Sequence, residues 1–512
     1  MTPSQRILIN TVSQYIRTVI NIVLSLYTVR LVLASLGQSD YGLYSLIAGV
    51  VAMLSFITNS LVNTTQRFVS FYQGKGNLEK LKEVFNNSLL IHIILGLLVV
   101  FLLEAFIPIL FNGFLNIPAG RESSAIVVYH LVVVMLFITF ITSPYRALLV
   151  SHENIVYISI VDILDAILKV VLVLIMTISN SDKLVFYSYI MMGVQLFNFI
   201  MLSVYCYVKY EECIYPNFFK LTKAYVKELG VYAGWHIYGT MCIAGRNQGI
   251  SIILNKAFGT MMNAAWGIGM QISGYTNFLS TAVVNAMAPQ IVKAEGGCDR
   301  ERSIYLSCLL SKINFFLMSV IAYPLLFEID TILALWLGTP PNYSSFFGKV
   351  FIIALLFDSL TIGLTHLNNA IGKIGFYTFV MSTPKFLTFV VTIFLVRLNT
   401  SLLSIGITYI VIEALCAFIR IPMICRQSGL DIKVYMNTVI GREILPSVIC
   451  VFICWFCLNF IEIKYRFVAT FILSTVVYSN CFYLLGLTGQ EKMIVQNLKN
   501  NFLTKLGYNK LI

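Results

Sequence analysis

Basic residues lie inside long apolar stretches of this sequence, where a charge is costly. Arg17 and Arg246 occupy apolar segments that begin near residues 10 and 229, and neither has an acidic residue within one helical turn. A charge at the middle of a bilayer costs at least ~2.5 to 3.5 kcal/mol on insertion scales, so it usually marks a pathway or an internal ion pair. Because guanidinium binds phosphate through two parallel hydrogen bonds, these two arginines are the first candidates for binding an anionic ligand. The second candidates are Arg30, Arg67, Lys169, Lys385 and Arg420.

Polar residues in the same segments follow the spacing of a helix. Gln14, Arg17, Asn21, Ser25 and Thr28 fall on one face of a helix at 100° per residue, and the rest of that helix is apolar. Such residues can simply hydrogen-bond one helix to another. Polar faces in several segments favour a shared aqueous cavity instead. The amide residues expected to line it are Gln14, Asn21, Asn59, Asn63, Asn247, Asn277 and Asn285.

Acidic residues inside the apolar segments are candidates for binding a coupling ion. Asp162 shares a helix face with Asp165 and Lys169, and Glu413 shares one with Arg420. The alternative for both groups is an internal ion pair that positions helices. Asp358 has no basic residue within a turn, so it either binds H⁺ or Na⁺ or pairs with Lys385 on the next segment. The candidates for ion coupling are Asp162, Asp358 and Glu413.

The composition fixes the class of protein. Of 512 residues, 58% are hydrophobic and only 11% are charged, whereas soluble domains are roughly one-quarter charged. This excludes a soluble enzyme and a secreted disulfide scaffold. The net charge of +12 comes from bases spread over short loops, so we expect no nucleic-acid partner. The eleven cysteines are scattered, and neither a GxxxxGK[ST] loop nor an HExxH motif occurs, so we expect no metal, cofactor or enzymatic activity.

The segments that bear these residues are predicted to be membrane helices in an all-α integral membrane protein. Apolar runs of about 18 to 26 residues give about fourteen spans. With an even number of spans, both termini lie on one side. If that side is cytoplasmic, its loops hold 21 lysines and arginines against 6 on the other side. The positive-inside rule therefore predicts cytoplasmic termini. The predicted spans begin near residues 10, 41, 85, 124, 154, 184, 229, 262, 304, 347, 376, 402, 443 and 467.

A weak internal repeat connects the two halves of the chain. An offset of 222 residues aligns Gly37 with Gly259 and Gly74 with Gly296, and it places Asn63 on Asn285. The offset joins even-numbered spans to even-numbered spans, so the halves have the same topology. We therefore predict a six-helix lobe at 1–225, a second one at 226–425, two additional helices at 426–487 and a cytoplasmic tail at 488–512.

Several short motifs resemble the bacterial polysaccharide flippases of the Wzx type, which export O-antigen and capsule units. These flippases belong to the multidrug/oligosaccharidyl-lipid/polysaccharide (MOP) exporter superfamily. The resemblance implies two six-helix lobes in a V around a central cavity, alternating access, and an undecaprenyl-diphosphate-linked oligosaccharide as cargo in the inner membrane. It also implies other polysaccharide-assembly membrane proteins as partners. The motifs include Leu36-Gly37, Asp40-Tyr41-Gly42-Leu43-Tyr44, Gln66-Arg67-Phe68, Gly74-Lys75-Gly76-Asn77, Ser143-Pro144-Tyr145-Arg146, Arg246-Asn247-Gln248-Gly249, Asn263-Ala264-Ala265-Trp266-Gly267, Ala288-Pro289-Gln290-Ile291 and Leu335-Trp336-Leu337-Gly338.

Two other functions remain open. A cation-coupled multidrug exporter of the same superfamily is expected to have an acidic cavity, whereas the predicted spans hold eight basic and five acidic residues. That excess favours an anionic cargo. A membrane-bound polysaccharide polymerase or ligase needs catalytic groups on the outer face, where Glu328 and Asp330 are the only close pair of acids.

Overall fold

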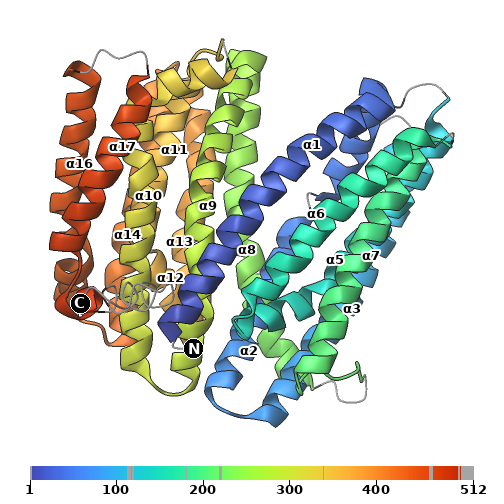
Figure 1. The fold of residues 1–512 in the computed structure, drawn as a ribbon, viewed down its shortest axis with the longest axis horizontal. Coiled ribbons are helices and arrows are strands. Elements are labelled where there is room, and N and C mark those ends of the chain that lie inside the picture. The colour runs from blue at the N-terminus through green and yellow to red at the C-terminus, as the bar shows by residue number, and fades with distance from the viewer. Residues whose placement is uncertain are drawn as a thin grey trace, which may run out of the picture. The chain divides into compact units, whose positions relative to one another are not determined.

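The computed structural model describes residues 3–52, 54–111, 117, 120–179, 181–217, 222–337, 339–460, 465–493 and 496 (Figure 1). Helices form every regular element in these ranges, as expected for an all-α membrane protein. Gly37, with φ 78°, breaks α1 into two helical parts. The helices of the first half are α1 (Pro3–Ala52), α2 (Ser55–Gly74), α3 (Leu78–Ala105), α4 (Ile107–Ile109), α5 (Glu122–Ser151), α6 (Ile155–Ile178) and α7 (Lys183–Lys209).

The second half repeats this order and then adds a hairpin. The helices of the repeat are α8 (Lys223–Phe258), α9 (Thr260–Gly296), α10 (Arg300–Leu337), α11 (Ser344–Ser359), α12 (Ile362–Ile371), α13 (Ile374–Arg397) and α14 (Leu402–Ser428). The added elements are α15 (Ile432–Tyr435), the π-helix η3 (Met436–Ile440), α16 (Gly441–Phe460), α17 (Arg466–Cys481) and the π-helix η4 (Phe482–Gly486).

The predicted membrane spans all fall on helices, but not all of these helices are uniformly apolar. Among the described residues, nine helices are long and apolar enough to cross a membrane. The pair α11 and α12, which meet at 49°, makes a tenth span. The predicted span near residue 41 coincides with the end of α1 and with α2. The predicted spans near residues 154, 229 and 262 coincide with α6, α8 and α9, respectively. In α6, three charged residues between Asp162 and Lys169 interrupt the apolar sequence. The polar residues proposed for a cavity thus lower the hydropathy of the helices that carry them.

Backbone conformation supports the internal repeat more strongly than the sequence does. Gly37 and Gly259, 222 residues apart, both have positive φ, at 78° and 84°. Gly76 and Cys298 share the same offset and have φ of 65° and 60°. Glycine is the residue that adopts this conformation without steric cost. The helices follow a similar register, because α6 and α13 are both 24 residues long and α7 and α14 are both 27 residues long.

Two compact units make up the chain, and each is described by itself. The N-terminal unit is Ile9–Ile237 with Gly296–Cys298, and the C-terminal unit is Tyr238–Glu295 and Asp299–Ile512 with Met1–Leu8. The boundary therefore falls inside α8. In the N-terminal unit α5 is central, because it packs against α2, α3 and α7. Its buried face, with Tyr129 and Phe140, contributes to a large apolar core.

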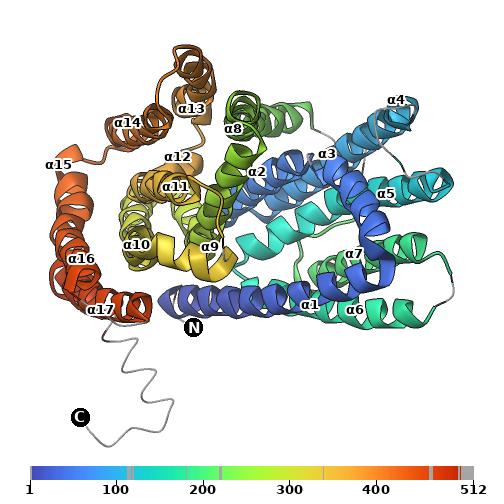
Figure 2. The ribbon, with the colours of Figure 1, turned by 90° about the horizontal axis from the view of Figure 1, so that it is seen from above.

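In the C-terminal unit α10 is the central helix. It packs against α11, α12, α16 and α17, and Figure 2 shows the added hairpin beside it. Glu328, which the sequence places on the outer face as a possible catalytic acid, is fully buried in α10. It accepts hydrogen bonds from Arg466 Nε at 2.9 Å and from Thr470 Oγ1 at 2.9 Å. Glu328 therefore anchors α17 to α10, and Asp330, the other acid of the predicted pair, contacts Lys349 at 3.4 Å.

Candidate functional site

A cluster of buried charge lies inside the N-terminal unit. Arg17 of α1 contacts Asp162 Oδ2 of α6 at 2.7 Å. Arg146 of α5 donates two further hydrogen bonds to the same carboxylate, at 3.2 and 2.8 Å. Asp162 is therefore held by two guanidinium groups from two other helices. An internal ion pair, which the sequence leaves open for this group, is therefore present at Asp162, with partners from α1 and α5.

Asp165, one turn further along α6, is less completely paired. Its Oδ2 accepts a hydrogen bond from Asn198 Nδ2 of α7 at 2.7 Å. Its Oδ1 is buried and has no hydrogen-bond partner in the described part of the chain. A buried carboxylate oxygen without a donor is energetically unfavourable, so it is a natural place for a proton or a small cation to bind.

A polar cavity of about 330 Å³ opens beside these groups. Its wall includes Asp162, Asp165 and Lys169 from α6. The opposite wall is the polar face of α1 that the sequence predicts, represented by Asn21, Ser25 and Thr28. The structure therefore brings the predicted polar stripe and the acidic residues to one cavity within a single unit.

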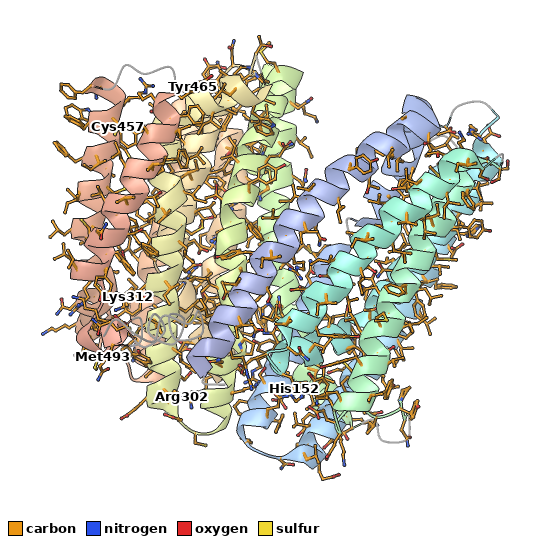
Figure 3. The ribbon with its side chains drawn as sticks, viewed as in Figure 1. His152, Arg302, Lys312, Cys457, Tyr465 and Met493 are labelled. Carbon is orange, nitrogen blue, oxygen red and sulfur yellow. The ribbon has the colours of Figure 1, made fainter. Side chains whose placement is uncertain are left out.

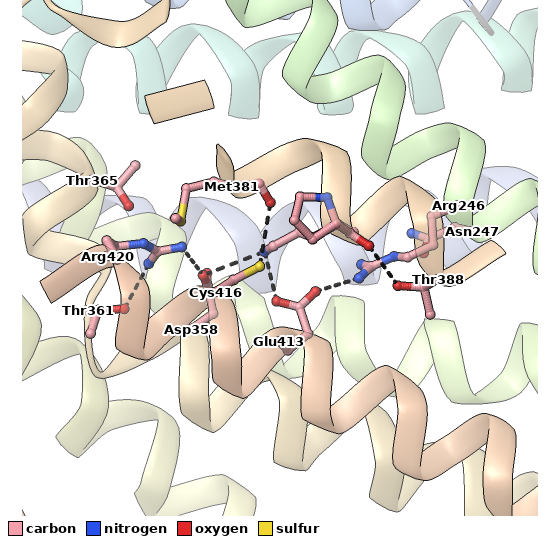
Figure 4. Close-up of polar contacts among 12 residues, drawn as sticks. Arg246, Asn247, Asp358, Thr361, Thr365, Met381, Thr388, Glu413, Cys416 and Arg420 are labelled. Carbon is pink, nitrogen blue, oxygen red and sulfur yellow. Dashed lines mark hydrogen bonds and ion pairs between the residues drawn. The ribbon is translucent and has the colours of Figure 1, made fainter. Parts of the chain in front are cut away.

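The C-terminal unit holds a second cluster, in which charges alternate along a chain (Figure 4). Arg246 of α8 contacts Glu413 Oε1 of α14 at 2.6 Å, and its guanidinium lies 4.2 Å from the ring centre of Tyr409. Lys385 Nζ of α13 binds Glu413 Oε2 at 2.7 Å and lies 3.9 Å from Asp358 Oδ1 of α11. Arg420 of α14 contacts the same Asp358 oxygen at 2.8 Å. The Asp358 side chain is the most accessible of the five, at 32% exposed.

This second cluster ends at the break between α11 and α12. Arg420 Nη1 donates to Thr361 Oγ1 at 2.9 Å. The backbone groups that the break leaves unpaired are satisfied by side chains: Tyr435 donates to Leu360 O at 2.8 Å, and Gly363 N–H donates to Ser311 Oγ at 3.1 Å. Discontinuous helices whose backbone groups are satisfied in this way are common at binding sites in transporters.

The two clusters occupy equivalent helices of the repeat. Each uses the first, fourth, fifth and sixth predicted span of its half: α1, α5, α6 and α7, or α8, α11, α13 and α14. Each contains three basic and two acidic side chains. The residues at equivalent positions differ, so an ungapped self-alignment could not detect the correspondence. The basic residues are Arg17, Arg146 and Lys169 in one cluster and Arg246, Lys385 and Arg420 in the other, and the acidic residues are Asp162, Asp165, Asp358 and Glu413.

Arg17 and Arg246, the first candidates for binding an anionic ligand, are both already paired with carboxylates. Arg17 and Arg246 have no acid within a turn, but each binds a carboxylate from another helix, 145 and 167 residues away in sequence. Glu413 pairs with Arg246 and Lys385 rather than with Arg420 on its own helix. Helix spacing cannot reveal such partners. Asp162, Asp358 and Glu413 are thus all paired with bases, whereas Asp165 has a buried oxygen without a hydrogen-bond partner among the described residues.

The remaining predicted site residues lie in varied surroundings. Arg67 is buried on α2, with its guanidinium 4.6 Å from the ring centre of Phe68 and 5.3 Å from that of Tyr232. The Arg30 side chain lies outside the described residues, although its backbone belongs to α1. Asn59, Asn63 and Asn277 are exposed, Asn247 and Asn285 are half-buried, and Gln14 is buried. Exposed amides on α2 and α9 suit a helix face that meets water.

Outside the membrane spans, Asp182 caps α7 and pairs with Arg121. Partial burial raises the pKa of Asp182, but hydrogen bonds from Ser124 and from Leu184 N–H, with the charge of Arg121, lower it by more. The pKa of this carboxyl is therefore below its usual value. Its contribution to stability is present above the unfolded-state pKa, about 3.9, and is lost as the pH falls through the lower folded-state value.

We expect Asp182→Ala to destabilise the protein by about 1 kcal/mol at pH 7, because it removes a helix cap. Asp182→Asn is the matched control, since asparagine caps equally well and lacks only the charge. Thermal unfolding in detergent measures both, and the deficit of the Asn variant should shrink as the pH is lowered below about 4. Equal unfolding temperatures for wild type and Asp182→Ala would contradict the capping role.

Comparison with known proteins identifies the fold. Neither a family profile nor a curated protein matches the sequence. Solved structures do match. A mutant of a MATE transporter has a TM-score of 0.73 at 14% identity, over 84% of this chain and 97% of that one. An outward-facing multidrug resistance MATE family transporter of the MOP superfamily has a TM-score of 0.72 at 13% identity, over 84% and 96%.

A third match is a MOP superfamily transporter from Pyrococcus furiosus whose binding pocket is described as having reverse polarity. Its TM-score is 0.70 at 14% identity, over 84% of this chain and 96% of that one. At these identities the likeness is one of fold. These matches, together with the long apolar helices, identify the chain as a multi-pass membrane protein with the fold of MATE family transporters of the MOP superfamily.

Proposed function

We propose that this chain is a membrane transporter that works by alternating access and is driven by a gradient of H⁺ or Na⁺. The observation that carries the proposal is the spare Oδ1 of Asp165 beside a polar cavity. The fold supports a transporter rather than an enzyme. The excess of lysine and arginine in one set of loops supports cytoplasmic termini, and the resemblance to bacterial polysaccharide flippases supports a location in the bacterial inner membrane.

In this proposal the coupling ion binds at Asp165. A proton taken up on Oδ1 neutralises the carboxyl, and the hydrogen bond that Asn198 donates to Oδ2 can persist. Asp162 keeps its charge because Arg17 and Arg146 both bind it. Proton binding therefore changes the charge of Asp165 and leaves the ion pairs of Asp162 in place. If the proton binds one conformation of the protein more tightly than the other, it shifts the populations of the two conformations.

The first candidate cargo is an undecaprenyl-diphosphate-linked oligosaccharide. Each cluster has one more basic than acidic group, so each has a surplus positive charge for an anion. Lys169 lines the cavity and is the base best placed to meet a phosphate in the N-terminal unit. Amides on the exposed faces of α2 and α9 can bind sugar hydroxyls. The sequence resemblance to polysaccharide flippases supports the same cargo.

The second candidate is a cationic amphiphile, as carried by a multidrug exporter, and the comparisons favour it. The neighbours in fold are MATE transporters, one of them a multidrug resistance protein. The pairing of Arg17 and Arg246 also leaves fewer uncommitted cations for a diphosphate than the sequence indicates. The reverse pocket polarity described for the Pyrococcus protein means that the fold alone does not select the sign of the cargo.

Reconstitution in proteoliposomes with an imposed pH or Na⁺ gradient separates the two cargoes. A labelled undecaprenyl-diphosphate oligosaccharide is scored by its accessibility to an external lectin, and a cationic dye is scored by its accumulation. A flippase moves only the lipid-linked sugar, whereas a multidrug exporter moves only the dye. Failure to move either compound with any gradient, in a preparation shown to be folded, would overturn the transporter proposal.

A further inference from the structure

The hairpin added after the repeat encloses ionisable groups that the proposed transport site does not use. Lys312 of α10, labelled in Figure 3, is only 1% exposed. Its Nζ lies 2.6 Å from the carboxylate of Glu491. Glu491 is itself buried. It also accepts a hydrogen bond from Thr488 N–H at 2.7 Å, while its own N–H donates to Thr488 Oγ1 at 3.3 Å. This reciprocal capping box fixes the segment after η4 against α10.

Glu443, near the start of α16, lies close enough to this pair for the charges of Lys312 and Glu491 to act on it. Its side chain is 1% exposed. Tyr478 of α17 donates a hydrogen bond to Oε2 at 3.2 Å, whereas Oε1 is buried and has no hydrogen-bond partner among the described residues. The charged groups that act on Glu443 are Lys312 from α10 and Glu491 from the segment after η4. Tyr323 of α10 and Tyr478 of α17 are the neutral titratable groups that face it.

The charges of this group do not balance. Two carboxyls, Glu443 and Glu491, share a single ammonium, that of Lys312, which Glu491 contacts directly. If both carboxyls were ionised, one buried negative charge would lack a cation. Burying an unpaired carboxylate costs several kcal/mol, and a buried carboxyl usually takes up a proton instead.

We propose that Glu443 is a proton-binding site built into the added hairpin. The proton binds Oε1, which then becomes a donor, and the group becomes electrically neutral. The site lies outside the two repeated sets of helices and is separate from Asp165. It therefore stands whether or not the proposed transport function is correct.

A cavity reaches the ion pair whose charges act on Glu443, although Glu443 itself is not part of its wall. A cavity of about 560 Å³ reaches Lys312 and Glu491, and its wall also includes Tyr305, Asp431 and Thr488. Water in this cavity can deliver a proton to the Glu491–Lys312 pair, and the charges of this pair act on Glu443.

The test is infrared spectroscopy of the purified full chain in lipid over a pH titration. A protonated carboxyl gives a separate C=O stretching band, and part of that band should vanish in Glu443→Gln. Glu328→Gln is the matched control, because Glu328 is equally buried in α10 but both of its carboxylate oxygens accept hydrogen bonds, from Arg466 and Thr470. It should leave the band unchanged. A band that is identical in wild type and Glu443→Gln would overturn the proposal.

Two further variants locate the proton and guard against misfolding. Glu491→Gln removes one negative charge, so Glu443 can pair with Lys312 and its titration midpoint should move to lower pH. Tyr478→Phe keeps the ring and removes the hydrogen bond to the ionised form, so the midpoint should move to higher pH. Either shift in the opposite direction, or no shift in both variants, would show that Glu443 does not hold the proton.

Discussion

Asp165→Asn is expected to abolish gradient-driven transport while the protein still folds. Asparagine has nearly the same shape as aspartate but cannot bind a proton or hold a cation by charge. Its carbonyl can still accept the hydrogen bond that Asn198 donates. Because Asp165 Oδ1 has no described partner to lose, the substitution should cost little stability. Because coupling between two ligands is typically worth about 5- to 150-fold, we expect a loss of about tenfold or more in cargo accumulation against a gradient in proteoliposomes, with cargo exchange down its own gradient retained.

Asp162→Asn is the contrasting variant. It leaves Arg17 and Arg146 without the carboxylate that both bind, so it should lower the unfolding temperature as well as transport. The comparison separates a coupling role from a structural one. Normal accumulation by Asp165→Asn at both low and neutral pH would rule out Asp165 as the coupling site.

The sequence predicts the helices well because their signal is local. Apolar length, loop charge and helix-breaking glycines are all properties of neighbouring residues, and each predicted span coincides with a helix. Gly37 and Gly259 illustrate this, since their identity in a self-alignment anticipates the same positive φ at both. The outer acid Glu328 is the contrary case. The sequence places it in a loop, but α10 continues to Leu337 because its apolar side packs on α11 and α17.

The site could be predicted only in part, because its partners are not local. Helix periodicity correctly places Asn21, Ser25 and Thr28 on one face of α1, and that face lines the cavity. The same periodicity pairs charges within a helix, whereas the structure pairs Arg246 with Glu413 across 167 residues. Helix periodicity likewise cannot predict the buried pair of Lys312 and Glu491, because these residues are 179 positions apart in the chain.

Pairing between helices also explains why an excess of basic residues in the predicted spans does not produce a site of unpaired cations for an anionic cargo. In both units most of the cations are bound to carboxylates. Each cluster has three bases and two carboxyls, so one positive charge per cluster is left for a cargo. In the proposed function, binding of a strongly anionic group therefore requires these ion pairs to change, which would tie cargo binding to the state of the clusters.

Glu413→Gln is expected to cause the largest loss of stability among the variants of the C-terminal cluster. Glu413 is buried and bound by both Arg246 and Lys385, so its neutralisation leaves three cations to one anion. Removing one partner of a buried ion pair typically costs 3–5 kcal/mol, because the remaining charge stays buried without compensation, so we expect a loss of about that size. Unfolding of the purified protein in detergent, followed by tryptophan fluorescence, measures it.

The double variant Glu413→Gln with Lys385→Met tests whether charge balance is the cause. It removes one cation along with the anion, so it should recover a large part of the lost stability. Asp330→Asn is the surface control, because Asp330 pairs with Lys349 at 3.4 Å and is 71% exposed. Its cost should stay below about 1 kcal/mol. If Glu413→Gln costs no more than Asp330→Asn, the cluster tolerates unbalanced charge, and water or an ion must reach it in the folded state.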